Sequence, residues 1–417
     1  MFIYKYHILL LVSVLVCVCS CSCSTSKKAT ITTSSTDELV AVDTFSAQAF
    51  STFTLNKEYD LGGKTFILPQ DVTISVKNGI FKNGTLIGQN TKIEGDQPVF
   101  DKVTIKGEWD VPEISTKMFK DLSYDNSLRD VMALTNDNVN NTVTIQQGNY
   151  YIKLSRNQED GICINANTRV VMNGIIRLKP NGFTNYCIVK INGPSSSIEG
   201  GGSIIGDRKY HTGTQGEWGM GVEFSGAQYS SISGLTVKDC WGDCIYVGDD
   251  SKNIVILNCV LDNSRRQGIS ITSADSVFVK KCVISNISGT PPQYAIDVQP
   301  NAEQTVTNVF VEEVQSIKCV GGFVVSGIGK NAKINNVVFS NCKIRGATAT
   351  HPIVLFKAED VTIEGCDVDS KSKTSVLVEE ISSLKAYNNI FKAKGNKHIV
   401  FLKSNKTDID NNQYIIK

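Results

Sequence analysis

A repeat of about 23 to 28 residues constrains the fold of this 417-residue chain most strongly. Each repeat carries two or three short runs of alternating apolar and polar residues, separated by Gly, Asn, Ser or Asp, which is typical of strands. No long stretch has the period of a helix. Short strands repeated without helices predict a parallel β-helix, in which each block is one coil stacked on the last. Five consecutive blocks occupy residues 219–241, 242–266, 267–293, 294–320 and 321–348.

Two columns of apolar residues set the expected register of the coils. The first column contains Val222, Ile245, Ile269 and Ile296. The second contains Cys259, Cys282, Cys342 and Cys366, with Leu235, Val314 and Ile390 in other coils. Free cysteine behaves as a small hydrophobe, so we expect both columns to point into the coil. At a coil spacing of roughly 4.8 Å a Cys259–Cys282 disulfide is a conceivable alternative.

The pattern extends upstream to a first regular coil at residues 142–152. Before it, residues 125–139 form the one plausible short helix, which would cover the open N-terminal end of the coils. We therefore expect an N-terminal β-rich region with a cap at residues 47–120 and a β-helix at residues 121–417. The predicted fold class is all-β, a single-stranded right-handed parallel β-helix with a short N-terminal cap helix.

The N-terminus predicts export. Lys5 precedes the apolar run at residues 8–20, which is the arrangement of a secretory signal. The residues "VCSC" resemble a bacterial lipoprotein signal that ends at a lipid-accepting Cys21, with Cys23 and a plain signal peptide as alternatives. Residues 1–21 would then be the signal, and the Ser/Thr-rich residues 22–46 a flexible tether. We expect a cell-envelope protein, lipid-anchored at the outer membrane or the cell surface.

The composition narrows the partners. A formal net charge of +1 gives no electrostatic case for nucleic acid. The nine cysteines outside the signal bring no converging His or carboxylate with them, so we expect no metal site. We expect a monomer that needs no cofactor, with Ca²⁺ as an option only if the protein is a lyase.

The same register predicts a strip on the outer surface. The residues that follow the inward column are Glu223, Tyr246, Ser270 and Asp297. A small-residue floor would consist of Gly221, Cys244, Gly268 and Ala295. The turn before the strands carries Trp218, Trp241, Arg265, Arg266, Asp243, Gln267 and Tyr294. Aromatic faces suit sugar rings and Arg forks suit acidic groups, so the strip predicts a linear polysaccharide as partner.

The loop "GDRKYHTGTQGEWG" places Asp207, Arg208, His211 and Glu217 at the same edge. Of the three aspartates in "WGDCIYVGDD", we expect Asp243 to face the glycan and Asp249 and Asp250 to form a solvated turn. Glu223 and Asp297 would lie roughly 14 Å apart by coil spacing. That is wider than the about 6.5–9.5 Å of inverting glycosidases, so Asp243 pairs better with either of them.

The coils, "GGGSIIGDR" and "GDCI" resemble the pectin-lyase-like superfamily, which includes polygalacturonases, polysaccharide lyases, alginate epimerases and phage tailspikes. "GEWG", "WGDCIY", "RRQGIS" and "GTPPQYAIDVQPN" also resemble a group of β-helix proteins from bacterial envelopes and phages. Gln299 stands where that group has a Glu. Of the polygalacturonase motifs, only Asp243 of a Gly-Asp-Asp is retained, and Gln267 replaces the catalytic-motif histidine. This departure argues against polygalacturonase chemistry.

Three functions remain open from the sequence. The first is a glycoside hydrolase with Asp243, Glu223 and Asp297 as candidate catalytic carboxylates. The second is a lyase or epimerase on uronic acids, in which Arg266 neutralises the carboxylate and another residue takes the C5 proton. The candidates for that base are Lys190, Tyr246 and His211. The third is a non-catalytic glycan-binding surface protein. The further substrate-binding candidates are Arg265, Trp241, Trp218, Gln267 and Glu217.

Overall fold

The computed structural model describes residues 47–95, 97–403 and 406–417. The expected signal, the lipidation site at Cys21 and the expected tether lie outside these residues. Within the described ranges, no helix is both long enough and apolar enough to cross a membrane.

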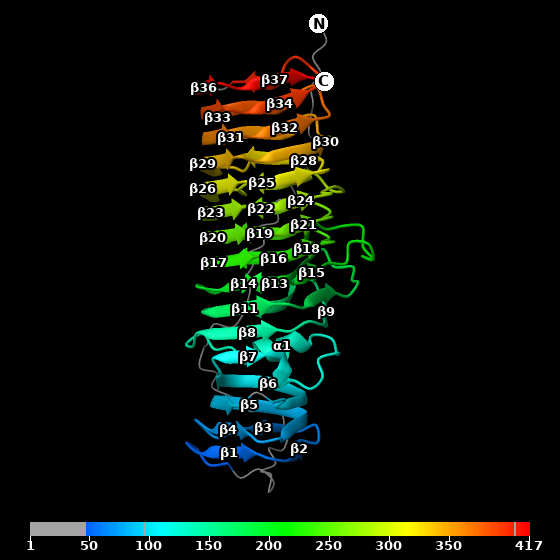
Figure 1. The fold of residues 1–417 in the computed structure, drawn as a ribbon, viewed down its shortest axis with the longest axis vertical. Helices are drawn as coiled ribbons and strands as arrows, with labels where there is room; N and C mark the ends of the chain where they lie inside the picture. Colours follow the sequence, from blue (N-terminus) through cyan, green and yellow to red (C-terminus); the bar gives the residue numbers. More distant parts are fainter. Residues whose placement is uncertain (1–46, 96, 404–405) are drawn as a thin grey trace. The chain divides into compact units, whose positions relative to one another are not determined.

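The described residues form parallel strands that wind into stacked coils (Figure 1). A regular coil contributes two strands to a long sheet and one strand to a shorter sheet, which is the third sheet of the molecule. Each strand pairs with its equivalents in the coils before and after it. Strands this short bury little apolar surface alone, so stacking is what stabilises them.

The N-terminal sheet has six strands. They are β1 (Thr52–Leu55), β2 (Glu58–Asp60), β3 (Thr65–Ile67), β4 (Thr73–Val76), β5 (Ile80–Glu94) and β6 (Phe100–Asp110). All of its pairings are parallel, so the N-terminal region is itself a small stack of coils.

The long sheet has twenty strands. They are β7 (Glu113–Ser115), β8 (Asn141–Ile145), β10 (Glu159–Ile164), β11 (Thr168–Met172), β13 (Asn185–Ile191), β14 (Ser197–Glu199), β16 (Trp218–Ser225), β17 (Gln228–Ser233), β19 (Ile245–Gly248), β20 (Ser251–Leu257), β22 (Ile269–Ile271), β23 (Ala274–Lys280), β25 (Tyr294–Val298), β26 (Thr305–Glu312), β28 (Gly321–Ser326), β29 (Lys333–Ser340), β31 (Ile353–Glu364), β33 (Val376–Tyr387), β35 (Ile399–Leu402) and β36 (Lys406–Asp410).

The third sheet has eleven strands, one from each coil. They are β9 (Asn149–Ile152), β12 (Ile175–Leu178), β15 (Ser203–Ile205), β18 (Thr236–Lys238), β21 (Val260–Asp262), β24 (Val283–Ser285), β27 (Gln315–Ile317), β30 (Lys343–Ala347), β32 (Asp367–Ser370), β34 (Ile390–Ala393) and β37 (Gln413–Ile416).

The predicted inward columns line the core. Val222, Ile245, Ile269 and Ile296 pair in successive coils and are fully buried. The four cysteines of the second column are buried and free, so they form no disulfide with one another. The prediction for Ile390 was wrong by one residue. Asn389 occupies that column instead, and its amide nitrogen donates to the carbonyl oxygen of Ile363 while its amide oxygen accepts from the backbone N–H of Cys366.

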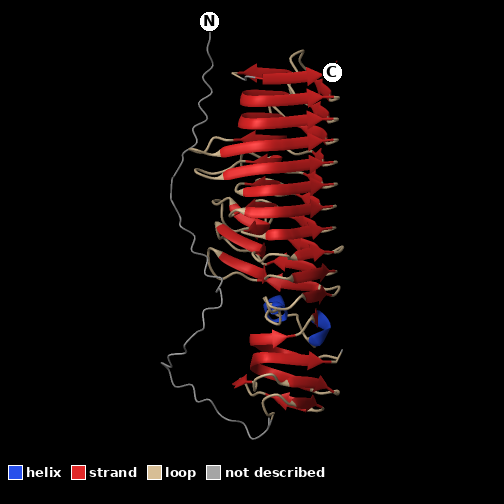
Figure 2. Cartoon of the chain, turned by 90° about the vertical axis from the view of Figure 1, so that its left-hand side faces the viewer, coloured by secondary structure: helices blue, strands red, loops and turns tan. Residues whose placement is uncertain are grey.

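The predicted cap helix is present but short. It is α1 (Ser127–Met132), and a 3₁₀ turn, η1 (Thr116–Met118), precedes it. Figure 2 shows both between the N-terminal coils and the longer stack. Asp130 accepts a hydrogen bond from Ile105 N on β6, and Arg129 donates to Gly161 O on β10. The helix therefore bridges two stacks of coils and does not close a free end.

The last described coil leaves core-facing side chains exposed. Phe401, Ile409 and Ile416 are in register with the buried Val378, Ala386 and Ala393 of the preceding coil. All three are nevertheless exposed, Ile416 by 61%. No described segment covers this end of the core.

Candidate functional site

The predicted strip exists as a register but is largely covered. Glu223 pairs with Tyr246, Tyr246 with Ser270, and Ser270 with Asp297, along β16, β19, β22 and β25. Ser270 and Asp297 are buried, with Asp297 only 2% exposed, while Glu223 and Tyr246 are partly exposed. The side chains thus share one face, but half of that face is not open to solvent.

The small-residue floor is a wrong prediction, because that column points into the coil. A Cβ on Gly268 would lie 2.4 Å from Ile284 Cγ2, and one on Gly221 would lie 2.6 Å from Val237 Cγ1. Cys244 and Ala295 are fully buried in the same column. These residues make room for the core side chains of the third sheet and offer nothing to a ligand.

A buried polar cluster lies where the strands begin, and it contains Asp243, Arg266, Gln267, Ser270 and Asp297. Asp243 accepts hydrogen bonds from the backbone N–H of Gln267 (2.9 Å), from Arg266 Nη1 (3.0 Å) and from Ser270 Oγ (2.7 Å). Its side chain has 0% exposure. The prediction that Asp243 faces the ligand surface directly was therefore wrong. Its three neighbours screen it while they bind it.

Gln267 links the two carboxyl groups of the cluster. Its Nε2 donates to Asp297 Oδ2 at 2.7 Å, and its Oε1 accepts from the backbone N–H of Tyr294 at 2.6 Å. Asp297 Oδ1 is buried and has no hydrogen-bond partner. A buried oxygen without a partner is destabilising if the carboxyl is ionised, so this environment favours a protonated Asp297.

The two carboxyl groups differ electrostatically. Burial raises the pKa of Asp297 to about 7, with the nearby Arg266 opposing and Asp243 adding to the effect. Burial also raises the pKa of Asp243, and the net shift is upward although Arg266, Ser270 and the backbone of Gln267 oppose it. A carboxyl that accepts three donors is bound as a carboxylate. The cluster therefore holds an ionised Asp243 beside an Asp297 that carries its proton up to about neutral pH.

Arg266 joins this cluster to the rim. Its Nε lies 3.4 Å from Glu217 Oε2, without hydrogen-bond geometry, while its Nη1 binds Asp243. Burial lowers the pKa of Arg266, and the neighbouring carboxylates of Asp243, Asp297 and Glu217 raise it by more. The guanidinium is a counter-ion inside the protein rather than an open binding group.

Glu223 and Lys190 pair in neighbouring strands and form an ion pair. Lys190 Nζ lies 3.5 Å from Glu223 Oε1 and 3.2 Å from Asp160 Oδ2. Asp160 was missed by the sequence analysis, although its coil pairs directly with that of Lys190. Tyr246 also has an internal partner, because its hydroxyl lies 2.7 Å from Thr272 Oγ1.

The two predicted tryptophans of the turn differ in exposure, because Trp218 is exposed and Trp241 is buried. Trp218 is 51% exposed and is the most exposed of the predicted aromatic residues. Trp241 is buried between the His211 ring, at a centroid distance of 3.9 Å, and the Arg265 guanidinium, at 4.0 Å. Arg265 also donates to Gly216 O at 2.5 Å. Trp241 and Arg265 therefore anchor the loop, and their role in substrate binding stays a prediction.

Asp207 binds several side chains and one backbone amide around the same loop. It accepts from Asn181 N and Nδ2, from Tyr186 Oη, and contacts His211 Nδ1 at 3.0 Å. The His211 side chain has 0% exposure, and its Nε2 is buried without a hydrogen-bond partner. His211 is therefore enclosed, and its ring is not open to a ligand.

Asp249 and Asp250 are exposed, as predicted for a solvated turn. Each accepts a hydrogen bond from a serine in a neighbouring coil, Ser225 and Ser273 respectively. Among the described residues, no three His, Cys, Asp or Glu side chains are grouped as metal ligands.

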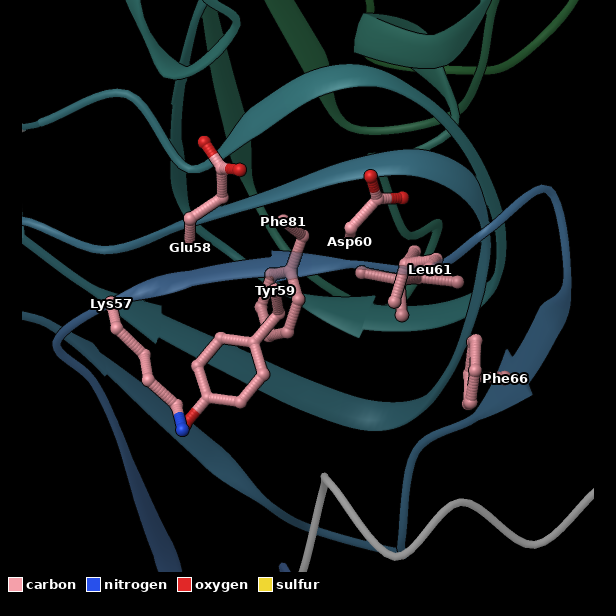
Figure 3. A pocket seen from close by; sticks show the side chains of 8 residues that line it. Lys57, Glu58, Tyr59, Asp60, Leu61, Phe66 and Phe81 are labelled. Atoms are coloured by element: carbon pink, nitrogen blue, oxygen red, sulfur yellow. The ribbon is translucent and has the colours of Figure 1, made fainter.

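A separate cavity of about 180 Å³ lies in the N-terminal sheet, far along the chain from this cluster. Figure 3 shows Tyr59 and Phe66 at its wall with Lys57, Glu58 and Asp60 around it. It is smaller than the roughly 300–1,000 Å³ of small-molecule sites, and it holds none of the predicted site residues.

Fold and register together define a parallel β-helix with a buried acidic cluster at one face. The chain belongs to the right-handed beta helix region family, whose model matches residues 139–310 and 268–415. This confirms the predicted right-handed parallel β-helix.

Two curated relatives come from Bacillus subtilis (strain 168). The uncharacterized protein YclG is 27% identical over 276 residues, which is 56% of this chain and 47% of YclG. The SPbeta prophage-derived uncharacterized protein YorA is 27% identical over 191 residues, which is 39% of this chain and 33% of YorA. The chain thus spans less than half the length of either relative. Among solved structures, a mutant tailspike protein of E. coli bacteriophage HK620, in complex with a pentasaccharide, is 14% identical, with 71% of this chain and 62% of that one covered at a TM-score of 0.49.

Proposed function

We propose that this face binds a glycan and hydrolyses it, with Asp297 as the general acid. The observation that carries the proposal is the pair of carboxyl groups joined through Gln267, of which one is ionised and the other has a pKa near 7. Glycoside hydrolysis needs one protonated and one ionised carboxyl, and different environments are how proteins provide them.

The fold does not need this cluster. In the later coils the column of Ser270 and Asp297 continues with Val324, Val354 and Leu377. Burying ionisable groups where apolar residues would fit is destabilising, so the presence of these groups indicates that they have a function. Perturbed carboxyl groups gathered at one place are therefore a functional-site signature.

In the proposed reaction, Asp297 gives its proton to the glycosidic oxygen as the bond to the anomeric carbon breaks. A water molecule attacks that carbon, and Asp243 takes the proton that the water releases. The products are two shorter chains, one with a new reducing end. Trp218 would stack on a sugar ring beside the cluster.

A substrate must first reach the carboxyl groups, because Asp243 and Asp297 are almost fully covered by their neighbours. Arg266 is the partly exposed member of the cluster and is in contact with the rim residue Glu217. Substrate binding would have to shift this side chain far enough to open Asp297, while the guanidinium stays paired with Asp243.

The same coverage favours one second candidate, a glycan-binding protein without hydrolysis. Here the exposed Trp218 and the partly exposed Glu223 and Tyr246 would hold the glycan, and the buried cluster would only shape the face. A lyase is less well supported, because Lys190 is the counter-ion of two carboxylates and His211 is enclosed.

Product analysis separates these functions. Wild-type protein should release reducing ends from at least one member of a polysaccharide panel, at a rate that falls above about pH 7 as Asp297 loses its proton. Asp297→Asn should lower the rate about 10²–10⁴-fold and keep glycan binding. An unsaturated product would indicate a lyase, and binding without release would support the second candidate. An unchanged rate in Asp297→Asn would remove this residue from the mechanism.

A further inference from the structure

Four cationic side chains around the proposed site have the charge to bind acidic sugars. Each of them already has partners in the protein. They are Lys190, Arg208, Arg265 and Arg266. We propose that the glycan bound at this face is neutral, without carboxylate or sulfate groups. The inference rests on the proposed function, because it names the substrate class of the same site.

Two of the cations are neutralised by carboxylates. Lys190 lies between Asp160 and Glu223, and Arg266 lies between Asp243 and Glu217. Drawing either cation toward an acidic sugar would leave buried carboxylates without a counter-ion, which is strongly destabilising.

The other two arginines bind oxygens of the backbone and of an amide. Arg208 donates to Asn263 Oδ1, to Ser264 O and to Ser288 O at 2.7–2.9 Å. Arg265 donates to Gly216 O and lies over Trp241. Both hold neighbouring coils and the loop together, so neither guanidinium presents a free fork for a carboxylate or sulfate.

The charge that remains open at the rim is mostly negative. The Glu217 side chain is 44% exposed, and Asp249 and Asp250 at the far end of β19 are exposed as well. Lys209 is an exposed cation on the loop turn, where its Nζ lies 5.2 Å above the Tyr210 ring. An anionic polymer along the face would meet carboxylates at both edges of the strip.

A neutral sugar could form a hydrogen bond with Asp297, which has a buried oxygen without a partner. Asp297 Oδ1 is buried and has no partner, and while protonated the carboxyl can donate to a neutral sugar oxygen. A negatively charged sugar group in the same place would lie against Asp243 and Asp297 in a low-dielectric site.

The test compares uronic acid polymers with their carboxyl-reduced forms, because each pair differs only in charge. Galacturonan, mannuronan and glucuronan and their reduced counterparts would be run against the full protein in affinity electrophoresis. We expect a reduced form to bind at least about tenfold more tightly than its acidic parent, with little dependence on salt. Tighter binding of an acidic form, weakened by salt, would overturn the inference and leave the proposed function standing. Binding of none of the six polymers would overturn both.

A variant locates the source of the discrimination. Glu217→Gln removes an exposed carboxylate and releases one partner of Arg266, so the preference for the neutral form should fall severalfold. Glu313→Gln is the matched control, because Glu313 is exposed in a different turn, between β26 and β27. Equal discrimination in wild type, Glu217→Gln and Glu313→Gln would show that rim charge does not select the glycan.

Discussion

At the scale of single residues, the charge states of two aspartates carry the account. Asp243 is bound by three donors, whereas Asp297 keeps one buried oxygen without a partner. The consequence for stability is measurable, because a carboxyl whose pKa is higher in the folded state binds more protons there than in the unfolded chain.

The free energy of unfolding should therefore fall as the pH rises from about 4 to about 7. The contribution of Asp297 is fully present below its unfolded pKa of 3.8 and is lost as the pH passes about 7. The change attributable to this group is up to about 4 kcal/mol. Asp297→Asn cannot ionise, so its denaturant unfolding should be flatter over this range. The same pH dependence in wild type and variant would contradict the protonated state assigned to Asp297.

Arg266→Ala should destabilise the protein by about 3–5 kcal/mol, because it leaves the buried Asp243 without its counter-ion. The matched control is Arg169→Ala, which removes an exposed ion pair with Glu199 and should change stability by at most about 1 kcal/mol. Thermal and urea unfolding of the two variants measures the difference. Similar effects in both would mean that the cluster does not depend on Arg266.

At the scale of elements, the sequence-based prediction and the structure differ in the first part of β16 and of the equivalent strands. Period-two alternation located the strands and their register, including the column from Glu223 to Asp297. It failed where β16 and its equivalents begin. There the consecutive amides of Gly221 and Val222 donate to consecutive carbonyls, of Asp243 and Cys244, in the next coil. Successive side chains then do not point to opposite faces, so the small-residue column turned inward.

Other parts of the site could not be predicted for related reasons. The loop that contains Asp207 and His211 has no period, and its contacts depend on side chains from neighbouring coils. Coverage of the carboxyl pair likewise depends on how Arg266 packs, which no spacing encodes. The position of Ile390 was wrong by one residue because Asn389 satisfies its amide group inside the column.

The inward orientation makes a direct prediction at Gly268. Gly268→Ala would place a methyl group 2.4 Å from Ile284 Cγ2 and 2.4 Å from Ala295 O, so it should destabilise the protein by about 1–3 kcal/mol. Gly201→Ala is the control, because a Cβ there meets nothing within 4 Å. Chemical unfolding decides between them. If Gly268→Ala were as stable as wild type, the small-residue column would face outward after all.

At the scale of the whole molecule, stability should be graded along the stack, because each coil contacts mainly its neighbours. The last described coil has core-facing residues in solvent and pairs on one side only. Hydrogen exchange should therefore be fastest in β35, β36 and β37 and slowest in central strands such as β20 and β23. Equal protection of these two regions would mean that the C-terminal coil is covered in solution.

The most direct measurement of the central claim is a crystal structure of Asp297→Asn soaked with a neutral oligosaccharide. We expect the sugar chain to lie across β16, β19, β22 and β25, with one ring against Trp218 and a sugar oxygen within hydrogen-bond distance of residue 297. A sugar bound instead at the N-terminal cavity or at another face would contradict the central claim.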